Sequence, residues 1–190
     1  MKKFVLGLMI SAGLLGATTV VANADTTGSS TGDVTFTGGT LSMSVDDTNL
    51  AFGSNTISSS DATLATSSTP TVTVSDLRGT SAGWTLTVAQ GQQFNTALNG
   101  TGSALTNAAL TVAGTESDSA VTNGSTTLTP GTTSTPGAAG TVASAKNGTG
   151  NGASTVTFSD SKLAVPGKTT KLATGYTTTL TWNLNDTPGN

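Results

Sequence analysis

The chain has 190 residues, of which 9% are charged and 4% aromatic, and it contains neither cysteine nor histidine. This length accommodates one domain with a proper core and leaves little room for a second. Without histidine and cysteine, no Ser-His-Asp or Cys-His triad can form, and the imidazole and thiolate ligands of zinc and copper sites are missing. The net charge of −3 argues against nucleic acid as a partner, because that binding needs clustered basic side chains.

The first 24 residues have the features of a signal peptide. Met1-Lys2-Lys3 is positively charged, residues 4–21 are largely apolar, and Ala22-Asn23-Ala24 is a small-x-small cleavage site. A membrane anchor is the alternative, but Gly, Ser and Thr interrupt the apolar run and a cleavage site follows it. We therefore expect an exported chain that starts at Asp25 and is not an integral membrane protein after cleavage.

The mature chain would be acidic. Removal of the two leader lysines leaves five basic against ten acidic side chains, a net charge of −5. Such a surface repels anionic polymers such as teichoic acids, unless a local basic patch forms from Lys162, Lys168 and Lys171.

The body of the chain is rich in Thr, Ser, Gly and Ala and contains many short alternating runs. This composition favours an all-β, antiparallel sandwich of the Ig-like type, which we place at residues 33–190, after a flexible leader at residues 25–32. Residues 34–36 and 41–45 alternate, and Gly38-Gly39 between them predicts a hairpin turn. Asp46-Asp47 predicts a further turn, because the spacing of a calcium loop is absent.

The next elements are a Ser-rich connection and two strands. Residues 58–68 read as the connection, and residues 71–74 and 84–88 as strands joined by the loop 77–83. Asp76 and Arg78 flank that loop. We favour a charged clasp that holds the loop over the alternative, a guanidinium fork offered to a ligand carboxylate.

The second half of the chain is less regular. A strand is expected at residues 108–112, and residues 116–152 read as a long, mobile Gly/Thr/Ser-rich insertion with one short strand near 126–128. Residues 155–158 and 163–166 resume the alternation and lead to a last strand at residues 176–184.

The only two tryptophans lie in matching strands. Trp84 and Leu86 share one face of the first strand, and Trp182 and Leu184 share one face of the last. We predict that these strands lie close together. On spacing alone we favour a core role for the tryptophans. The alternative is that they serve as platforms for sugar rings or as anchors for a protein partner. In a mixed outcome, one edge of each indole would be exposed.

These motifs and their flanks resemble the WxL domain family of Gram-positive surface proteins. Val74-Ser75-Asp76-Leu77-Arg78-Gly79 followed by Gly83-Trp84-Thr85-Leu86-Thr87-Val88 is similar to the context of the family's first motif. Tyr176 to Leu184 is similar to the second. Gly39-Thr40-Leu41 and Leu50-Ala51-Phe52-Gly53 look like its opening strands, so the resemblance covers nearly the whole mature chain.

The resemblance implies a non-covalent cell-wall module that associates with peptidoglycan at the Gram-positive surface, together with other surface proteins. Trp84, Leu86, Trp182 and Leu184 would be its signature, supported by Asp76 and Arg78. The chain ends at Asn190 without a Leu-Pro-x-Thr-Gly signal, so we expect the folded domain to provide retention. No cofactor or metal is implied.

Two other functions stay open. A structural or adhesive surface protein, held by a protein partner, would use its Thr-rich faces and loop to engage host or neighbouring proteins. A two-carboxylate glycosidase is formally conceivable, but the only glutamate, Glu116, lies in the least regular segment. We therefore do not expect an enzyme.

Overall fold

The structure, a computed structural model, describes residues 27–47 and 49–189. The expected signal peptide lies outside this part of the chain. The described residues contain eleven strands and no helix, which confirms the all-β prediction: β1 (Leu41–Asp47), β2 (Ala62–Ala65), β3 (Thr71–Asp76), β4 (Trp84–Gln90), β5 (Ala109–Ala113), β6 (Val121–Asn123), β7 (Ser125–Thr127), β8 (Gly140–Ala145), β9 (Gly152–Thr157), β10 (Lys162–Val165) and β11 (Leu180–Asn185).

Two units can be distinguished, one that ends at Thr35 and a compact one from Phe36 to Asn190. All strands belong to the second unit. Residues 27–40, which cross the boundary, form no strand and are exposed. Nowhere in the described residues is there a helix with the length and apolarity needed to cross a membrane.

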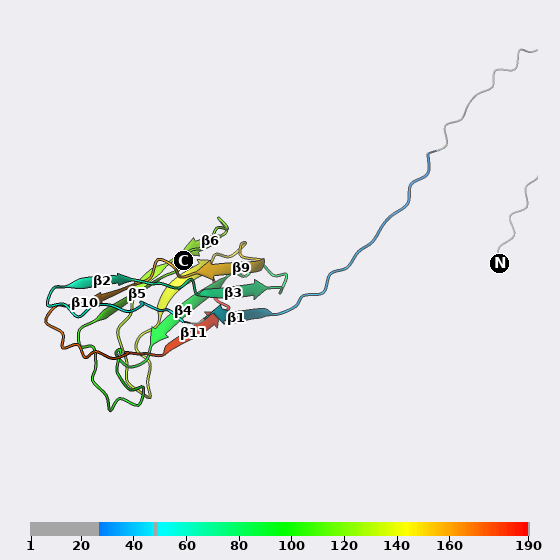
Figure 1. Cartoon of the computed structure of the whole chain (residues 1–190). Coiled ribbons are helices and arrows are strands. Elements are labelled where there is room, and N and C mark those ends of the chain that lie inside the picture. Colours follow the sequence, from blue (N-terminus) through cyan, green and yellow to red (C-terminus); the bar gives the residue numbers. More distant parts are fainter. Residues whose placement is uncertain (1–26, 48, 190) are drawn as a thin grey trace, which may run out of the picture. The chain divides into compact units, whose positions relative to one another are not determined.

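The strands form three antiparallel sheets with the orders β1-β3-β9, β2-β10-β5-β7 and β11-β4-β8-β6 (Figure 1). The first two sheets continue into each other, because β2 and β3 follow one another in the chain and pair with β10 and β9 in nearly the same register. The third sheet forms the second layer of a sandwich-like arrangement. Whether the sandwich is Ig-like stays a prediction.

The core lies between the two layers, where the alternation of the strands places their apolar side chains. Burial of such side chains supplies most of the driving force for folding, about 1.5–3 kcal/mol for each large one. Most of the threonines and serines between them face outward, but Ser144 of β8 and Ser154 of β9 are buried. The completely buried apolar side chains of β3, β4, β5, β8 and β9 and the turn after β9 are Val74, Trp84, Leu86, Val88, Val112, Val142, Ala143, Ala145, Val156 and Phe158.

One side of the sandwich is closed by a strand that changes layers. β6 pairs with β8 in one layer, and after Gly124 the chain continues as β7, which pairs with β5 in the other layer. The Gly124 N–H donates to the Val142 carbonyl, and the Gly124 carbonyl accepts from the Gly114 N–H, both at 2.9 Å. Backbone hydrogen bonds therefore join the two layers here.

The opposite side is open. β1 is an edge of one layer and β11 an edge of the other, and no strand in the described residues covers the outer edge of either. Residues 49–58 and 171–179 run along this side without forming strands. We call the gap between these edges the seam.

The predicted proximity of the two tryptophan strands is confirmed. β4 and β11 are antiparallel neighbours, with Leu86 opposite Leu184 and Val88 opposite Trp182. This register places both indoles on the same face of the sheet. The last strand is shorter than predicted and begins at Leu180. Ahead of it, Thr177 exchanges backbone hydrogen bonds with Asn95, a residue that follows β4 in the chain.

The predicted N-terminal hairpin is wrong. β1 pairs with β3, and residues 34–36 form no strand. Gly38 allows the backbone to pass close to Arg78, since a Cβ on it would lie 2.5 Å from the Arg78 carbonyl oxygen. The turn expected at Asp46-Asp47 is also wrong, because both residues belong to β1, where the Asp46 carboxylate accepts from Ser44 Oγ and Thr73 Oγ1.

Two further segments differ from the sequence-based expectation. Residues 50–52 form no strand, and β2 lies within the segment that reads as a Ser-rich connection. The expected insertion at residues 116–152 instead contains β6, β7 and β8. β8 lies between β4 and β6 and contributes Val142, Ala143 and Ala145 to the core, so it is a central strand.

The position of β8 can be tested with a pair of adjacent substitutions. Val142 is fully buried and Thr141 is exposed. We expect Val142→Ala to lower the free energy of unfolding by roughly 2 kcal/mol through lost burial and a residual cavity, and Thr141→Ala to change it by about 0.5 kcal/mol or less. Urea unfolding followed by circular dichroism measures both. Equal small effects would mean that this segment is a loop.

Candidate functional site

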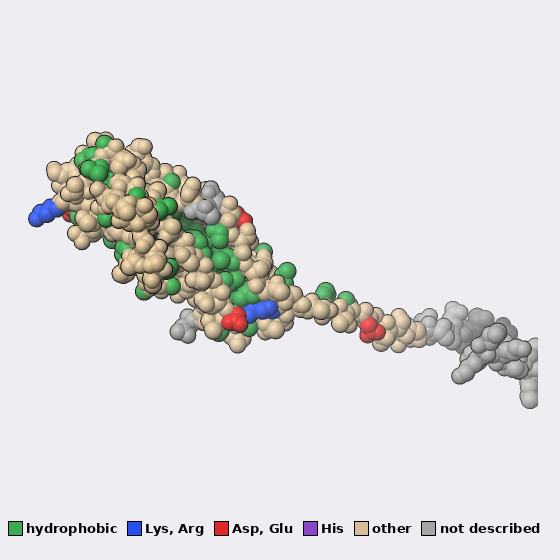
Figure 2. Space-filling model, turned by 90° about the horizontal axis from the view of Figure 1, so that it is seen from below, with side chains coloured by type: hydrophobic (Ala, Val, Ile, Leu, Met, Phe, Trp, Pro, Cys, Tyr) green, Lys and Arg blue, Asp and Glu red, His purple; other side chains and the backbone are tan. Residues whose placement is uncertain are grey.

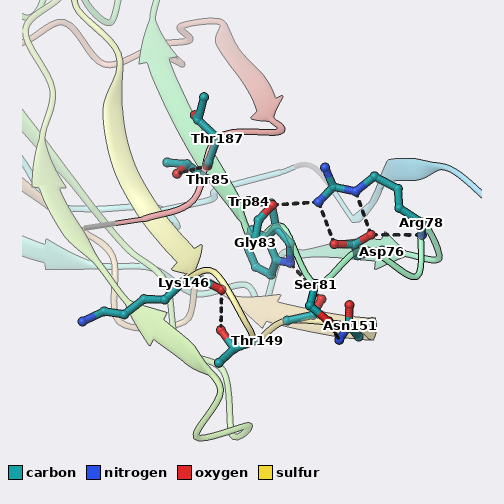
Figure 3. A network of polar contacts seen from close by, with 11 residues as sticks. Asp76, Arg78, Ser81, Gly83, Trp84, Thr85, Lys146, Thr149, Asn151 and Thr187 are labelled. Carbon is teal, nitrogen blue, oxygen red and sulfur yellow. Dashed lines mark hydrogen bonds and ion pairs between the residues drawn. The ribbon is translucent and has the colours of Figure 1, made fainter.

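Trp84 is a core residue. Its side chain is fully buried, and its indole Nε1 donates to the Gly150 carbonyl oxygen at 3.1 Å (Figure 3). Gly150 has a φ of +76°, and a Cβ there would lie 2.7 Å from the indole nitrogen. The glycine-rich stretch therefore packs directly on the indole, and Trp84 has no surface to offer to a ligand. Leu86 is also fully buried.

Two loops are joined above this tryptophan. The Asn151 side-chain amide donates to Ser81 Oγ at 2.9 Å, and the Gly148 N–H donates to the Ser81 carbonyl at 2.7 Å (Figure 3). Gly83 has a φ of +75°, and a Cβ there would lie 2.5 Å from the Ala145 carbonyl oxygen. Only glycine fits between β4 and the end of β8, so the loop 77–83 is held against the loop 146–151.

Asp76 and Arg78 form the expected clasp. The Arg78 guanidinium donates through Nε to Asp76 Oδ1 at 2.9 Å and through Nη2 to Oδ2 at 2.7 Å (Figure 3). The Nη2 group also donates to the Gly83 carbonyl at 2.7 Å, which ties β3 to the start of β4. The Asp76 side chain is fully buried and that of Arg78 is 18% exposed. The two-point geometry makes the pair specific for arginine.

The clasp also sets the ionisation of both groups. The hydrogen bonds from Arg78 hold the pKa of the Asp76 carboxyl below its usual value, although burial acts in the opposite direction. The same contact raises the pKa of Arg78, and the nearby Asp186 carboxylate adds to this. Both groups therefore remain charged around neutral pH.

Trp182 lies in a different environment from Trp84. It is half-buried at the seam and packs against Phe158 of the other layer, with ring centroids 4.7 Å apart and planes at 48°. Leu184 is also half-buried. The two tryptophans thus differ: Trp84 lies wholly in the core and Trp182 is partly accessible. The mixed outcome considered from the sequence had an exposed edge on each indole.

A polar hollow of about 610 Å³ lies at one end of the seam, between β1 and β11. Arg78 Nη1 donates no hydrogen bond within the described residues, so it can still donate to a ligand. An indole, a guanidinium, a carboxylate and two amides around one hollow suit a ligand with hydroxyl, amide and carboxylate groups. The hollow is lined by Leu41, Ser42, Met43, Arg78, Trp182, Asn183, Leu184, Asn185 and Asp186.

A larger apolar hollow of about 1370 Å³ occupies the rest of the seam. Figure 2 shows apolar side chains gathered in a hollow on the face of the molecule that it presents. The floor belongs to the core and includes Phe94, Leu110 and Leu163, and the walls include half-buried side chains from both layers: Val45, Leu50, Phe52, Leu64, Tyr176, Leu180 and Trp182.

Lys171 is held by the protein, which reduces the basic patch considered from the sequence. Its ammonium nitrogen lies 3.0–3.2 Å from the carbonyl oxygens of Ser58, Pro166, Gly167 and Thr169. It therefore joins the two segments that border the apolar hollow. Within residues 27–47 and 49–189, no group of three acidic side chains is arranged to hold a metal ion.

Comparison with known families identifies the chain. Residues 17–188 match the family model described as the WxL domain, surface cell wall-binding. The protein therefore belongs to the WxL domain family, a cell wall-binding rather than a catalytic family, and this places it at the cell surface. No curated protein and no solved structure gives a significant match.

Sequence reasoning identified the tryptophan strands and the clasp but missed much of the site. The polar hollow is also lined by Asn183 and Asn185 of β11 and by Asp186, which follows the strand. They border the hollow only because β11 is an edge strand. The sequence predicts that Gly150 lies in a loop, and a run of glycines gives no signal of what packs against it. The pairing of β4 with β11 is the observation that places these groups.

The two tryptophans should differ in their contribution to stability. We expect Trp84→Ala to lower the free energy of unfolding by about 3–5 kcal/mol, because it opens a cavity in the core and leaves the Gly150 carbonyl unpaired. Trp182→Ala should cost roughly 2 kcal/mol, since its side chain is only half-buried. Urea unfolding followed by circular dichroism distinguishes them, and equal losses would contradict the assignment.

The clasp should make stability depend on pH in a defined direction. Because the folded pKa of Asp76 lies below the unfolded value of about 3.9, its contribution is complete above about pH 4 and is lost as the pH falls through the folded pKa. We expect Asp76→Asn to cost about 2 kcal/mol at neutral pH, a difference from wild type that shrinks below pH 4. Urea unfolding across this range measures it, and a difference that stays constant to the lowest pH would exclude the clasp as its source.

Proposed function

We propose that the mature chain, from Asp25 onward, is exported and binds the cell wall of a Gram-positive bacterium non-covalently, with peptidoglycan as its ligand. The observation that carries this proposal is the match to the surface cell wall-binding WxL family over residues 17–188. The leader with its cleavage site supports export.

The polar hollow is the surface that we assign to the wall ligand. Peptidoglycan offers sugar rings with apolar faces, and stem peptides with amide and carboxylate groups. The accessible part of Trp182 suits a sugar ring, and Arg78 Nη1 suits a carboxylate. Asn183 and Asn185 contribute to the rim of the hollow, because their side chains alternate with Trp182 and Leu184 and lie on the outward face of β11. Trp84 supports this surface from the core without touching the ligand.

We further propose that the protein works within a multi-protein complex at the surface. The apolar hollow leaves a large contiguous group of apolar side chains open along the seam. The largest contiguous apolar patch of a protein is often functional, and such patches commonly bind other proteins.

The test is sedimentation of the mature protein with purified Gram-positive cell walls stripped of protein. We expect the wild type to sediment with the walls. Ser42 is exposed on β1 and lines the polar hollow, so Ser42→Trp should fill the entrance and reduce the bound fraction at least several-fold. Thr122→Trp, at an exposed position of β6 away from the hollow, is the matched control and should bind like the wild type.

The outcomes separate the competing explanations. If the wild type stays in solution, direct wall binding is wrong, and retention by a protein partner becomes the better account. If Ser42→Trp and Thr122→Trp both bind normally, the wall is the ligand but the polar hollow is not the site. Circular dichroism of each variant confirms that its fold is intact.

A further inference from the structure

β11 is an edge strand without the usual protection against pairing with another chain. Natural edges are commonly short, or carry charged residues or proline. Of the other edge strands, β2, β6 and β7 have only three or four residues, and β1 contains Asp46. β9 has six uncharged residues, but its edge is partly covered, because Thr157 exchanges backbone hydrogen bonds with Thr115. β11 has six residues, Leu-Thr-Trp-Asn-Leu-Asn, with no charge and no proline.

The same strand borders the apolar hollow. Leu180 and Trp182 face into it, and the core residues Phe94 and Leu110 form part of its floor. A strand added beside β11 would therefore gain backbone hydrogen bonds along its length and would cover the half-buried side chains of the seam. Its own side chains on one face would have to be apolar.

The chain itself carries a segment of this kind. Val34-Thr35-Phe36-Thr37 alternates apolar and β-branched polar residues, has no charge and forms no strand in this structure. Val34 is 77% and Phe36 is 89% exposed, and they would share one face of an extended chain. These are the two most exposed large apolar side chains among the described residues.

We propose that the seam of one copy takes up the segment around Val34 and Phe36 of a second copy, as a strand added to the free edge of β11. Residues 31–37 in extended form span about 23 Å and the six residues of β11 about 20 Å, at about 3.3 Å per residue. The lengths therefore match. Phe36 and Val34 enter the apolar hollow, and Thr35 faces solvent.

This contact is heterologous, because the segment of one copy meets the seam of the next. Such contacts form rings if they close and linear assemblies if they do not. The polar hollow proposed for the wall ligand also borders β11, so an added strand would cover part of it. Association is therefore measured without cell walls, and wall binding at concentrations at which the wild type is monomeric. Loss of one does not imply loss of the other.

The first experiment measures the mass of the mature protein in solution by light scattering after gel filtration, up to the limit of its solubility. We expect the wild type to form species larger than a monomer as the concentration rises. Phe36→Asp should abolish association without loss of structure, because this side chain is exposed in the monomer. Thr35→Asp adds the same charge on the opposite face and is the matched control that should still associate.

A wild type that remains monomeric at every concentration would overturn the proposal. So would association that survives Phe36→Asp, which would place the interface elsewhere. A monomer whose tryptophan fluorescence changes on Phe36→Asp but not on Thr35→Asp would also overturn the second copy as the occupant, because the segment would then act within one molecule.

The absence of cysteine from the chain permits a second test of the pairing. Protein carrying Thr35→Cys is mixed under oxidising conditions with protein that carries a cysteine at one of three outward positions of β11, Thr181, Asn183 or Asn185. Side chains directly opposite on neighbouring strands lie close enough to form a disulfide. We expect a mixed disulfide dimer, identified by mass, at one of these positions, and its absence at all three would overturn the proposed pairing.

Discussion

The buried indole of Trp84 is the contact on which the rest of the structure depends. It fills the core between the layers, and its hydrogen bond to the Gly150 carbonyl brings the glycine-rich loop 146–151 down onto β4. Gly83 and Gly150 are needed because any side chain there would collide with the neighbouring strand or with the indole itself. The Asp76–Arg78 clasp then fixes the loop that leads into β4. The packing of the core and the positions of these loops therefore depend on each other.

The sandwich has one closed side and one open side. On one side, Gly124 lets the chain pass from one layer to the other, and backbone hydrogen bonds close the core. On the other side, β1 and β11 are both edges, and the core is exposed between them. Family membership gives the role at the cell wall. The surfaces that we propose for it lie on the open side: a polar hollow for a glycan and peptide ligand, and an apolar hollow for an added strand.

Local patterns predicted those elements in which apolar side chains alternate strictly. The strands around Val72, Trp84 and Trp182 are examples, because alternation on a half-buried sheet leaves its period in the sequence. Prediction failed where few side chains mark the strand. β8 reads Gly-Thr-Val-Ala-Ser-Ala, and although residues 142–145 are all buried, Val142 is the only large apolar side chain that marks the strand. Residues 34–36 show the opposite error: a strand was predicted because they alternate, but they have no partner strand and form none.

The sequence by itself determined an all-β chain, the excluded chemistries, the two tryptophan strands and the resemblance to a wall-binding family, because composition and short motifs are local properties. Only the tertiary structure decided that Trp84 is enclosed while Trp182 reaches the seam. The two residues lie in nearly identical motifs, and what separates them is the order of the sheet, in which β4 is flanked on both sides and β11 on one. Strand order depends on pairings between residues about a hundred positions apart, and no local pattern encodes it.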